Sequence, residues 1–181
     1  MAIYTVFESV NMGSTHYAER IFDAVADVDV ENGTFGYLDG LADGETNVYN
    51  FKAGTKAGAK VVVADNPAWT EDASRTVHQR KDKYVIEAGT KFRVRVVKVN
   101  DEFGITIEGV TAASKAKMDV GAYVTIDAAT GKLVAKDTAT ADAVMEAVVE
   151  RKRVVGGTLA TAAHNYGYSK VMYEARINAL A

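Results

Sequence analysis

The chain has 181 residues, of which 48% are hydrophobic and 25% charged, and its formal net charge is −3. This length allows one domain with a sizeable core or two small domains. The mildly acidic balance excludes the basic surface that nucleic-acid binding requires, and the absence of cysteine excludes disulfides and thiolate metal sites. No run approaches the roughly 18 apolar residues of a membrane span, so we expect neither a nucleic-acid nor a membrane partner.

Residues 1–20 carry few periodic apolar positions, which favours an extended arm or a loosely packed lead-in segment. They also lack the basic leader and long apolar run of a signal peptide, so we expect synthesis in a reducing cytoplasm. We therefore divide the chain into this arm, a β domain over residues 21–160, and a C-terminal segment over residues 161–181. The last segment is expected to pack on the domain or on a neighbouring molecule.

The first half of the β domain alternates short apolar runs with turn residues. The Asn-Gly pair at 32–33 predicts a turn, because glycine adopts positive φ at low cost, and residues 34–38 form the expected strand after it. Residues 45–51 are a further candidate strand. Residues 61–64 are continuously apolar, which indicates a strand buried on both faces. Pro67 stops this strand because proline lacks the backbone donor that a sheet needs.

Residues 84–107 carry the strongest strand signal of the chain, in the order strand, turn, strand, turn, strand. The apolar side chains at positions 92, 94 and 96 share one side of the middle strand, while Arg93 and Arg95 share the other. This alternation is the pattern of a strand with one dry face. It predicts a β scaffold with a charged outer face.

The second half of the domain contains one clear hairpin and two ambiguous segments. Residues 121–126 and 132–135 flank a turn that ends in glycine, which predicts a hairpin. Residues 141–153 fit a helical face and one side of a strand equally well, and residues 170–177 form either a last strand or a short helix. The many short apolar runs predict a mainly β fold, a compact β-barrel or β-sandwich with short helical or extended flanking segments.

No motif of the chain predicts catalysis or cofactor binding. The glycine-rich loop at 54–60 has three residues between its glycines, whereas a phosphate-binding P-loop has four and continues with Gly-Lys-Ser/Thr. His16, His78 and His164 lie far apart and lack the spacing that places two metal ligands on one helix face. The carboxylates between positions 39 and 45 lack the alternation of a calcium loop. We therefore predict no catalytic residue, no metal, no cofactor and no enzymatic activity.

Five residues are candidates for contact with a partner protein. Arg93 and Arg95 either form bidentate bonds to carboxylates of a neighbouring chain or protect a sheet edge from unwanted pairing. Arg151 and Arg153 belong to the one basic cluster, which either meets an acidic partner or ends a strand in water. Trp69 is a core side chain or an interface anchor, and its polar neighbours favour the anchor.

Four segments, in the same order, resemble the head-decoration (capsid-stabilising) proteins of tailed bacteriophages, and together they cover about residues 28–155. The segments are an acidic stretch with Asn-Gly and a strand at 29–38, an apolar strand ending in proline at 61–67, a Gly-Thr-Lys strand with arginine at 87–94, and a Val-Gly strand with its hairpin at 120–133. The chain departs from this pattern at residues 97–102, where a glycine-containing turn is expected and Gly104 comes late.

The resemblance implies a structural virion protein that is assembled in the host cytoplasm and binds the outer face of the phage head. Its implied partners are the major capsid protein and further copies of itself, and the family has no catalytic residues to transfer. Two alternatives stay open. One is a phage tail or baseplate component. The other is a carbohydrate-binding β module in which Trp69, Tyr37 and Tyr49 stack on sugar rings.

Overall fold

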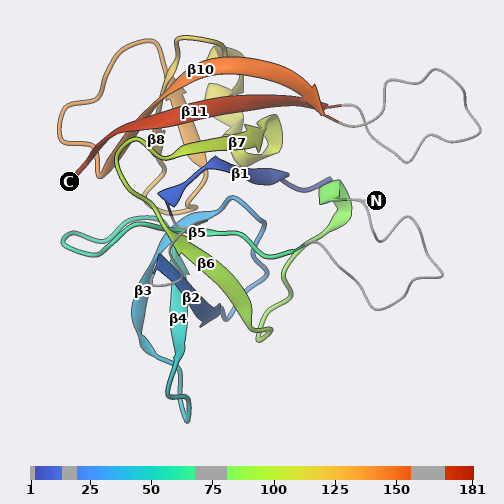
Figure 1. Ribbon diagram of the computed structural model, residues 1–181, viewed down its shortest axis with the longest axis vertical. Coiled ribbons are helices and arrows are strands. Elements are labelled where there is room, and N and C mark those ends of the chain that lie inside the picture. Colours follow the sequence, from blue (N-terminus) through green and yellow to red (C-terminus); the bar gives the residue numbers. More distant parts are fainter. Residues whose placement is uncertain (1–2, 14–19, 68–80, 156–169) are drawn as a thin grey trace, which may run out of the picture.

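The computed structural model describes residues 3–13, 20–67, 81–155 and 170–181, and the chain is mainly β, as predicted. Two sheets build it, a closed barrel of five strands and a sheet of six strands (Figure 1). The barrel has the order β2 (Ile21–Val25), β4 (Val48–Ala53), β3 (Phe35–Leu41), β5 (Val62–Ala64) and β6 (Phe92–Val96). The sheet has the order β1 (Phe7–Asn11), β7 (Glu102–Thr106), β11 (Lys170–Leu180), β10 (Met145–Val155), β8 (Tyr123–Ile126) and β9 (Leu133–Lys136).

Alternate residues of the strands fill the barrel interior. Phe92 and Val94 of β6 are buried there together with Val62 of β5, as the period of two along a strand requires. The ring of Phe51 packs edge-on against Phe92, with 5.4 Å between the ring centroids. Val63 is buried on the opposite side of β5. The prediction that this apolar strand is buried on both faces is therefore confirmed.

A second hydrophobic core, separate from the barrel interior, lies between the outer wall of the barrel and the sheet. The side chains of Val63 and its register partner Phe35 point outward from the barrel. They pack against apolar side chains of the sheet. The ring of Phe35 meets Phe103 of β7 edge-on at 5.4 Å, and Phe103 stacks on Phe7 of β1 at 5.9 Å. These buried aromatic rings connect the outer wall of the barrel to two strands of the sheet.

The hairpin predicted in the second half of the chain is formed by β8 and β9, and its turn lies against the barrel. The backbone N–H of Phe35 donates to the carbonyl oxygen of Gly131 over 2.9 Å. A Cβ atom on Gly131 would lie 2.0 Å from the carbonyl oxygen of Phe35, and one on Gly54 would lie 2.0 Å from that of Ala128. Both glycines also have positive φ, 70° and 97°. Only glycine permits this close approach of the two backbones.

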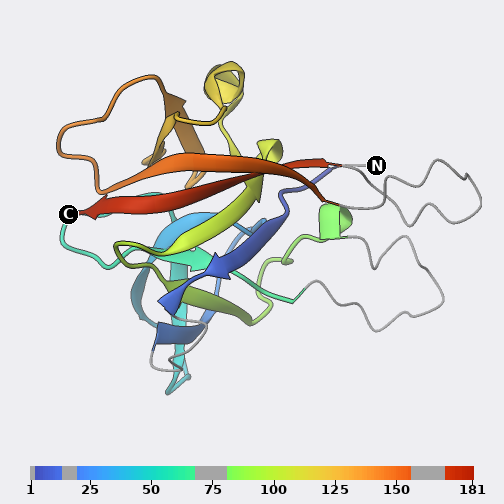
Figure 2. The same ribbon diagram turned by 45° about the horizontal axis from the view of Figure 1, so that its top comes forward.

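Three 3-10 helices complete the described structure: η4 (Lys81–Lys83), η5 (Ile107–Gly109) and η6 (Ala112–Lys117). The segment that leads into η6 covers the free side of β9 (Figure 2). The N–H of Thr111 donates to the carbonyl oxygen of Leu133 over 2.8 Å, and Ser114 Oγ accepts from the N–H of Ala135 over 3.1 Å. These contacts occupy the edge of β9 that would otherwise be open to strand pairing.

The central segment differs from its prediction. β6 lies within the expected middle strand, but β7 begins at Glu102, inside the turn expected at 100–104, and belongs to a different sheet. Residues 84–86 form only an isolated bridge. The cause is the turn at Asn100, which has a φ of 73°. The carboxylate of Asp101 holds this turn, because it accepts from the backbone N–H groups of Lys98 and Gly13 over 2.8 Å each. The chain thereby passes from the barrel into the sheet.

The N-terminal segment also differs from its prediction, whereas residues 170–177, expected as a last strand or a short helix, form a strand. The expected N-terminal arm contains β1, which pairs with β7 and places Phe7 in the core. The expected C-terminal segment contains β11, an inner strand between β7 and β10. Residues 141–153, which fitted a helix and a strand equally well, run into β10 as a strand. Neighbours from distant parts of the chain bury these short apolar patterns, which alone gave too weak a signal.

Within the described ranges, no helix has both the length and the apolar character needed to cross a membrane.

Candidate partner-binding surface

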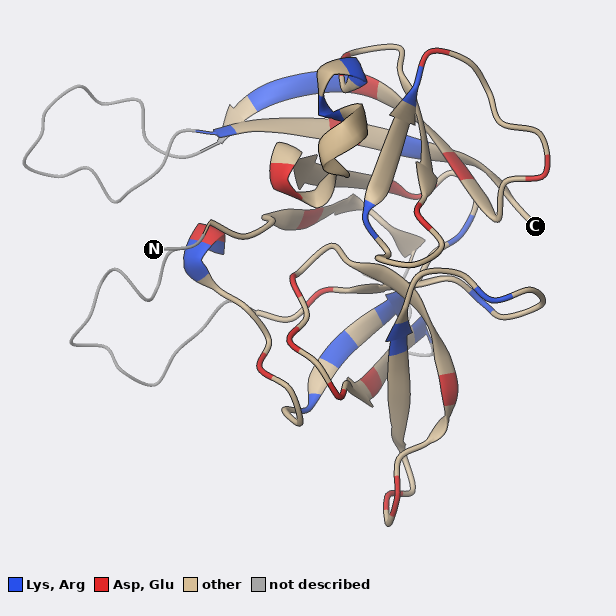
Figure 3. Cartoon of the chain, turned by 180° about the vertical axis from the view of Figure 1, so that it is seen from behind, with Lys and Arg blue, Asp and Glu red and all other residues tan. Residues whose placement is uncertain are grey.

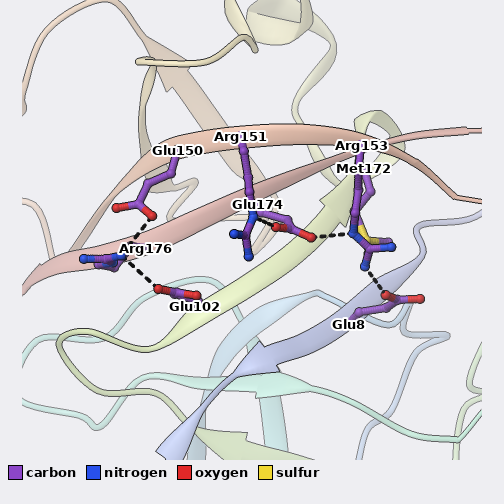
Figure 4. Close-up of polar contacts among 8 residues, drawn as sticks. All are labelled: Glu8, Glu102, Glu150, Arg151, Arg153, Met172, Glu174 and Arg176. Atoms are coloured by element: carbon purple, nitrogen blue, oxygen red, sulfur yellow. Dashed lines mark hydrogen bonds and ion pairs between the residues drawn. The ribbon is translucent and has the colours of Figure 1, made fainter.

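The outward side of β1, β7, β11 and β10 carries a network of charged side chains, which we call the ion-pair face (Figure 4). In Figure 3 the basic residues of β10 form a blue band along the strand. The network alternates acidic and basic groups across neighbouring strands. Its members are Glu8 of β1, Glu102 of β7, Glu150, Arg151 and Arg153 of β10, and Glu174 and Arg176 of β11.

A bulge in β10 places the arginines on this side of the sheet. Val149 pairs with Ala175, both in the core, but the next pair along the strands is Arg151 with Glu174. Glu150 is therefore an extra residue on β10. Because side chains alternate between the two faces of a strand, one extra residue moves all later side chains to the opposite face. Without the bulge, Arg151 would point to the same side as Val149.

Glu174 is the centre of the network. It is 5% exposed, and its two carboxylate oxygens accept hydrogen bonds from the Nε atoms of Arg151 and Arg153. A terminal nitrogen of Arg153 also lies 2.6 Å from Glu8 Oε2, and Lys81 Nζ lies 3.1 Å from Glu8 Oε1. The alternating charges thus connect η4, β1, β11 and β10.

A second, shorter set lies at the other end of the same face. One terminal nitrogen of Arg176 contacts Glu102 Oε1 at 2.9 Å and Glu150 Oε2 at 3.0 Å. It links β7, β11 and β10. Charge-assisted bonds of this kind fix the directions of the long arginine side chains.

The arginines lower the pKa values of the carboxyl groups between them. Burial acts to raise the pKa of Glu174, but the hydrogen bonds from Arg151 and Arg153 outweigh it, and the pKa lies below its usual value of 4.5. Partial burial likewise acts to raise the pKa of Glu8, and the bonds from Arg153 and Lys81 bring it below 4.5. Both groups are therefore ionised at neutral pH, and their ionised forms favour the folded state.

These shifts predict how stability depends on pH. A carboxyl group whose pKa is lower in the folded than in the unfolded state stabilises the fold above its unfolded pKa, and this stabilisation is lost as pH falls through the folded pKa. Glu174→Gln should lower the free energy of unfolding by about 2 kcal/mol at pH 7. The difference from the unchanged protein should shrink as pH falls below the usual carboxyl pKa. Urea denaturation at a series of pH values measures both quantities.

The matched control is Glu150→Gln, because the Glu150 side chain is 41% exposed and makes one ion pair, to Arg176. Its removal should change the free energy of unfolding by less than about 1 kcal/mol. Equal losses in Glu174→Gln and Glu150→Gln, or a loss in Glu174→Gln that does not vary with pH, would contradict the central position of Glu174.

The structure brings together two of the five residues predicted to contact a partner. Arg151 and Arg153 lie side by side on the ion-pair face, paired with carboxylates of their own chain, and their side chains are 62% and 44% exposed. Arg93 lies on β6 of the barrel, is partly buried and makes no ion pair with any described residue. Trp69 lies outside the described residues.

The expected exposure of Arg95 is wrong. The residue is 9% exposed, and its Nε donates to the carboxylate of Asp65. Its register partner on β5 is Val63, which faces the core shared with the sheet. The outer side of β6 is therefore covered at this position, and Arg95 is satisfied within the chain.

The end of the β10–β11 hairpin combines exposed apolar and basic side chains. Val154 and Val171 are register partners, 55% and 41% exposed. Arg151, Lys152 and Arg153 precede Val154 on the same strand, and we call these five residues the hairpin end. In Figures 1 and 2 the last described residues of β10 and the first of β11 lie on the same side of the molecule as η4.

Sequence reasoning did not find the acidic partners of the arginines. Glu8 lies 145 positions from Arg153 along the chain, in a segment expected to be an arm. Glu174 stands in an alternating stretch of β11 that also fitted a short helix. The sequence shows only that these residues are acidic. They meet the arginines because β11 pairs with both β7 and β10, and that pairing is not visible in the sequence.

No group of three or more histidine, cysteine, aspartate or glutamate side chains in the described part of the chain is placed to hold a metal ion. The three histidines lie outside that part. Comparisons of this chain with known protein families, with curated proteins and with solved structures find no match.

Proposed function

We propose that the chain is a structural virion protein that binds the outer face of a tailed-phage head and stabilises contacts between major capsid subunits. The supporting observation is the hairpin end, where exposed Val154 and Val171 lie with Lys152 on one face of the strand pair, while Arg151 and Arg153 lie on the other face. Protein interfaces combine apolar contact with a polar rim, and arginine is enriched in them. The face that carries the valines suits an apolar patch of a partner, and the face that carries the two arginines suits acidic groups of a partner.

The ion-pair face supports this role because it holds the arginines in place before binding. Glu174 contacts both Arg151 and Arg153, and Glu8 contacts Arg153 a second time. Binding costs less when long side chains are already ordered in the free protein. The two arginines are thus presented to a partner in defined directions while part of each side chain stays exposed.

The physical basis of the proposed activity is mass action. A protein that binds the assembled head and not the separate subunits stabilises the head by its binding free energy. The effect is multiplied over the many equivalent sites of the shell. No chemical step is required.

Isolated phage heads test the proposal directly. Purified chain is incubated with heads that lack it, and we expect saturable co-sedimentation and a higher temperature of head disassembly. Antibody labelling of complete virions, viewed by electron microscopy, should mark the head. Labelling of the tail would identify a tail or baseplate component instead. A glycan-array signal without binding to heads would favour the carbohydrate-binding alternative, and either result contradicts the proposal.

The hairpin end itself is tested by replacing its two valines together, Val154→Asp and Val171→Asp. Burial of one valine contributes roughly 1.5 kcal/mol, and 1.4 kcal/mol is a tenfold change in affinity. We therefore expect head binding to weaken at least about tenfold, measured by the sedimentation assay. Val28→Asp is the matched control, because Val28 is 66% exposed on the barrel. Equal loss in the control, or no loss in the double variant, would contradict the assignment of this surface.

A further inference from the structure

A groove with an apolar floor opens on the barrel. Its volume is about 230 Å³, and its floor contains Phe22, Leu38, Tyr49, Val62 and Val96. We call it the barrel groove. None of these residues belongs to the ion-pair face or to the hairpin end, so the groove is a separate surface.

Strands from all sides of the barrel build the floor. Phe22 of β2 and Tyr49 of β4 pack edge to face, with 5.6 Å between the ring centroids and 86° between the ring planes. Phe22 and Leu38 pack against the barrel core but are only partly buried. An apolar floor of this kind favours an apolar side chain as its occupant.

The rim of the groove is basic. A neighbouring hollow of about 310 Å³ shares Phe22, Lys60 and Val96 with the groove and adds Arg20 and Lys98. Lys60 and Lys98 are exposed, and neither makes an ion pair with any described residue. Arg20 has a partner within the chain, so the positive charge available to a ligand comes from Lys60 and Lys98.

We propose that the barrel groove binds an acidic peptide segment of a partner protein. One apolar side chain of the segment lies over Phe22, Leu38 and Tyr49, and neighbouring carboxylates pair with Lys60 and Lys98. Charge complementarity at the rim selects and orients the segment, while the floor supplies the apolar contact. The inference does not depend on a phage head being the partner.

The same observations argue against a nucleic acid in the groove. Stacking of bases requires open aromatic faces, whereas the rings of Phe22 and Tyr49 pack against each other and the rest of the floor is aliphatic.

A nuclear magnetic resonance titration of the isotopically labelled full chain tests the proposal. The probe is the blocked hexapeptide Asp-Glu-Leu-Phe-Asp-Glu, and a second peptide has lysine in place of each acidic residue. We expect the acidic peptide to shift the backbone amide signals of Phe22, Lys60 and Val96, with an affinity that falls as salt is added. The lysine peptide should leave these signals in place.

Charge reversal at the rim supplies the matched variants. Lys60→Glu combined with Lys98→Glu should weaken binding of the acidic peptide at least tenfold, because two attractive contacts become repulsive. The control is Lys115→Glu, an exposed lysine of η6 on the sheet, and its affinity should equal that of the unchanged protein. Amide spectra of both variants establish that the fold is intact.

Four outcomes overturn the proposal. They are no groove shifts at millimolar acidic peptide, equal binding of the lysine peptide, shifts confined to other surfaces, and unchanged affinity in the double variant. Groove shifts with single-stranded oligothymidylate and none with the acidic peptide would identify a nucleic-acid site instead. Because the readout is local to the barrel groove, these results are distinguishable from failure of the head-binding proposal.

Discussion

Phe103→Ala is expected to lower the free energy of unfolding by about 4 kcal/mol. Phe103 is fully buried, and its ring contacts Phe7 of β1 on one side and Phe35 of the barrel on the other. Truncation therefore removes contacts with two other strands at once. The cavity opens where the barrel meets the sheet, so we expect both parts of the molecule to lose stability together.

Urea denaturation followed by circular dichroism measures the loss. Hydrogen exchange of β6 and β11 reports the barrel and the sheet separately. Phe103→Leu keeps most of the side-chain volume and should cost about 1 kcal/mol. If β11 lost its protection in Phe103→Ala while β6 kept the protection of the unchanged protein, the two parts would unfold independently. That result would contradict the importance of the shared core.

Gly54→Ala should be nearly as damaging, with a loss of about 3 kcal/mol. A φ of 97° alone costs an L-residue roughly 1–2 kcal/mol. The added Cβ would also lie 2.0 Å from the carbonyl oxygen of Ala128, a backbone atom that cannot rotate away. We expect the β8–β9 turn to move off the barrel, and the N–H of Gly54 to lose its 3.0 Å bond to Phe35.

Gly58→Ala is the matched control for this prediction. Gly58 stands between β4 and β5, as Gly54 does, and has a φ of 73°, but nothing lies within 4 Å of its added Cβ. It should carry the backbone cost alone, about 1 kcal/mol. Gly131 lies on the opposite side of the same backbone contact. Gly131→Ala should therefore lower the free energy of unfolding about as much as Gly54→Ala does. Equal midpoints of urea denaturation for the Gly54 and Gly58 variants would show that the turn does not depend on this contact.

Local patterns predicted individual strands well. The apolar run at 61–64 and the hairpin whose turn ends in Gly131 formed as expected, because burial on both faces and a glycine with positive φ are properties of a few neighbouring residues. The assignment of strands to sheets was not predictable in this way. β6 and β7 are separated by a short turn, yet one closes the barrel and the other pairs with β1 and β11.

The charged surface was predictable only in part, for the same reason. The basic cluster of Arg151 and Arg153 was visible in the sequence, but the bulge at Glu150 that turns these residues away from the core was not. The alternation of β6 correctly placed Arg95 on the outer side of the barrel. It could not show that the sheet covers this side at Val63, the register partner of Arg95. Contacts between distant strands decide which charges stay exposed.

The position of β11 inside the sheet has a consequence for biosynthesis. The barrel strands are contiguous between Ile21 and Val96, so they can associate as soon as this stretch has left the ribosome. β7 and β10, in contrast, lack the strand between them until translation has passed Leu180. The nascent barrel must therefore expose Phe35 and Val63 to water for part of its synthesis, and chaperone binding at this stage is expected to concentrate on that wall.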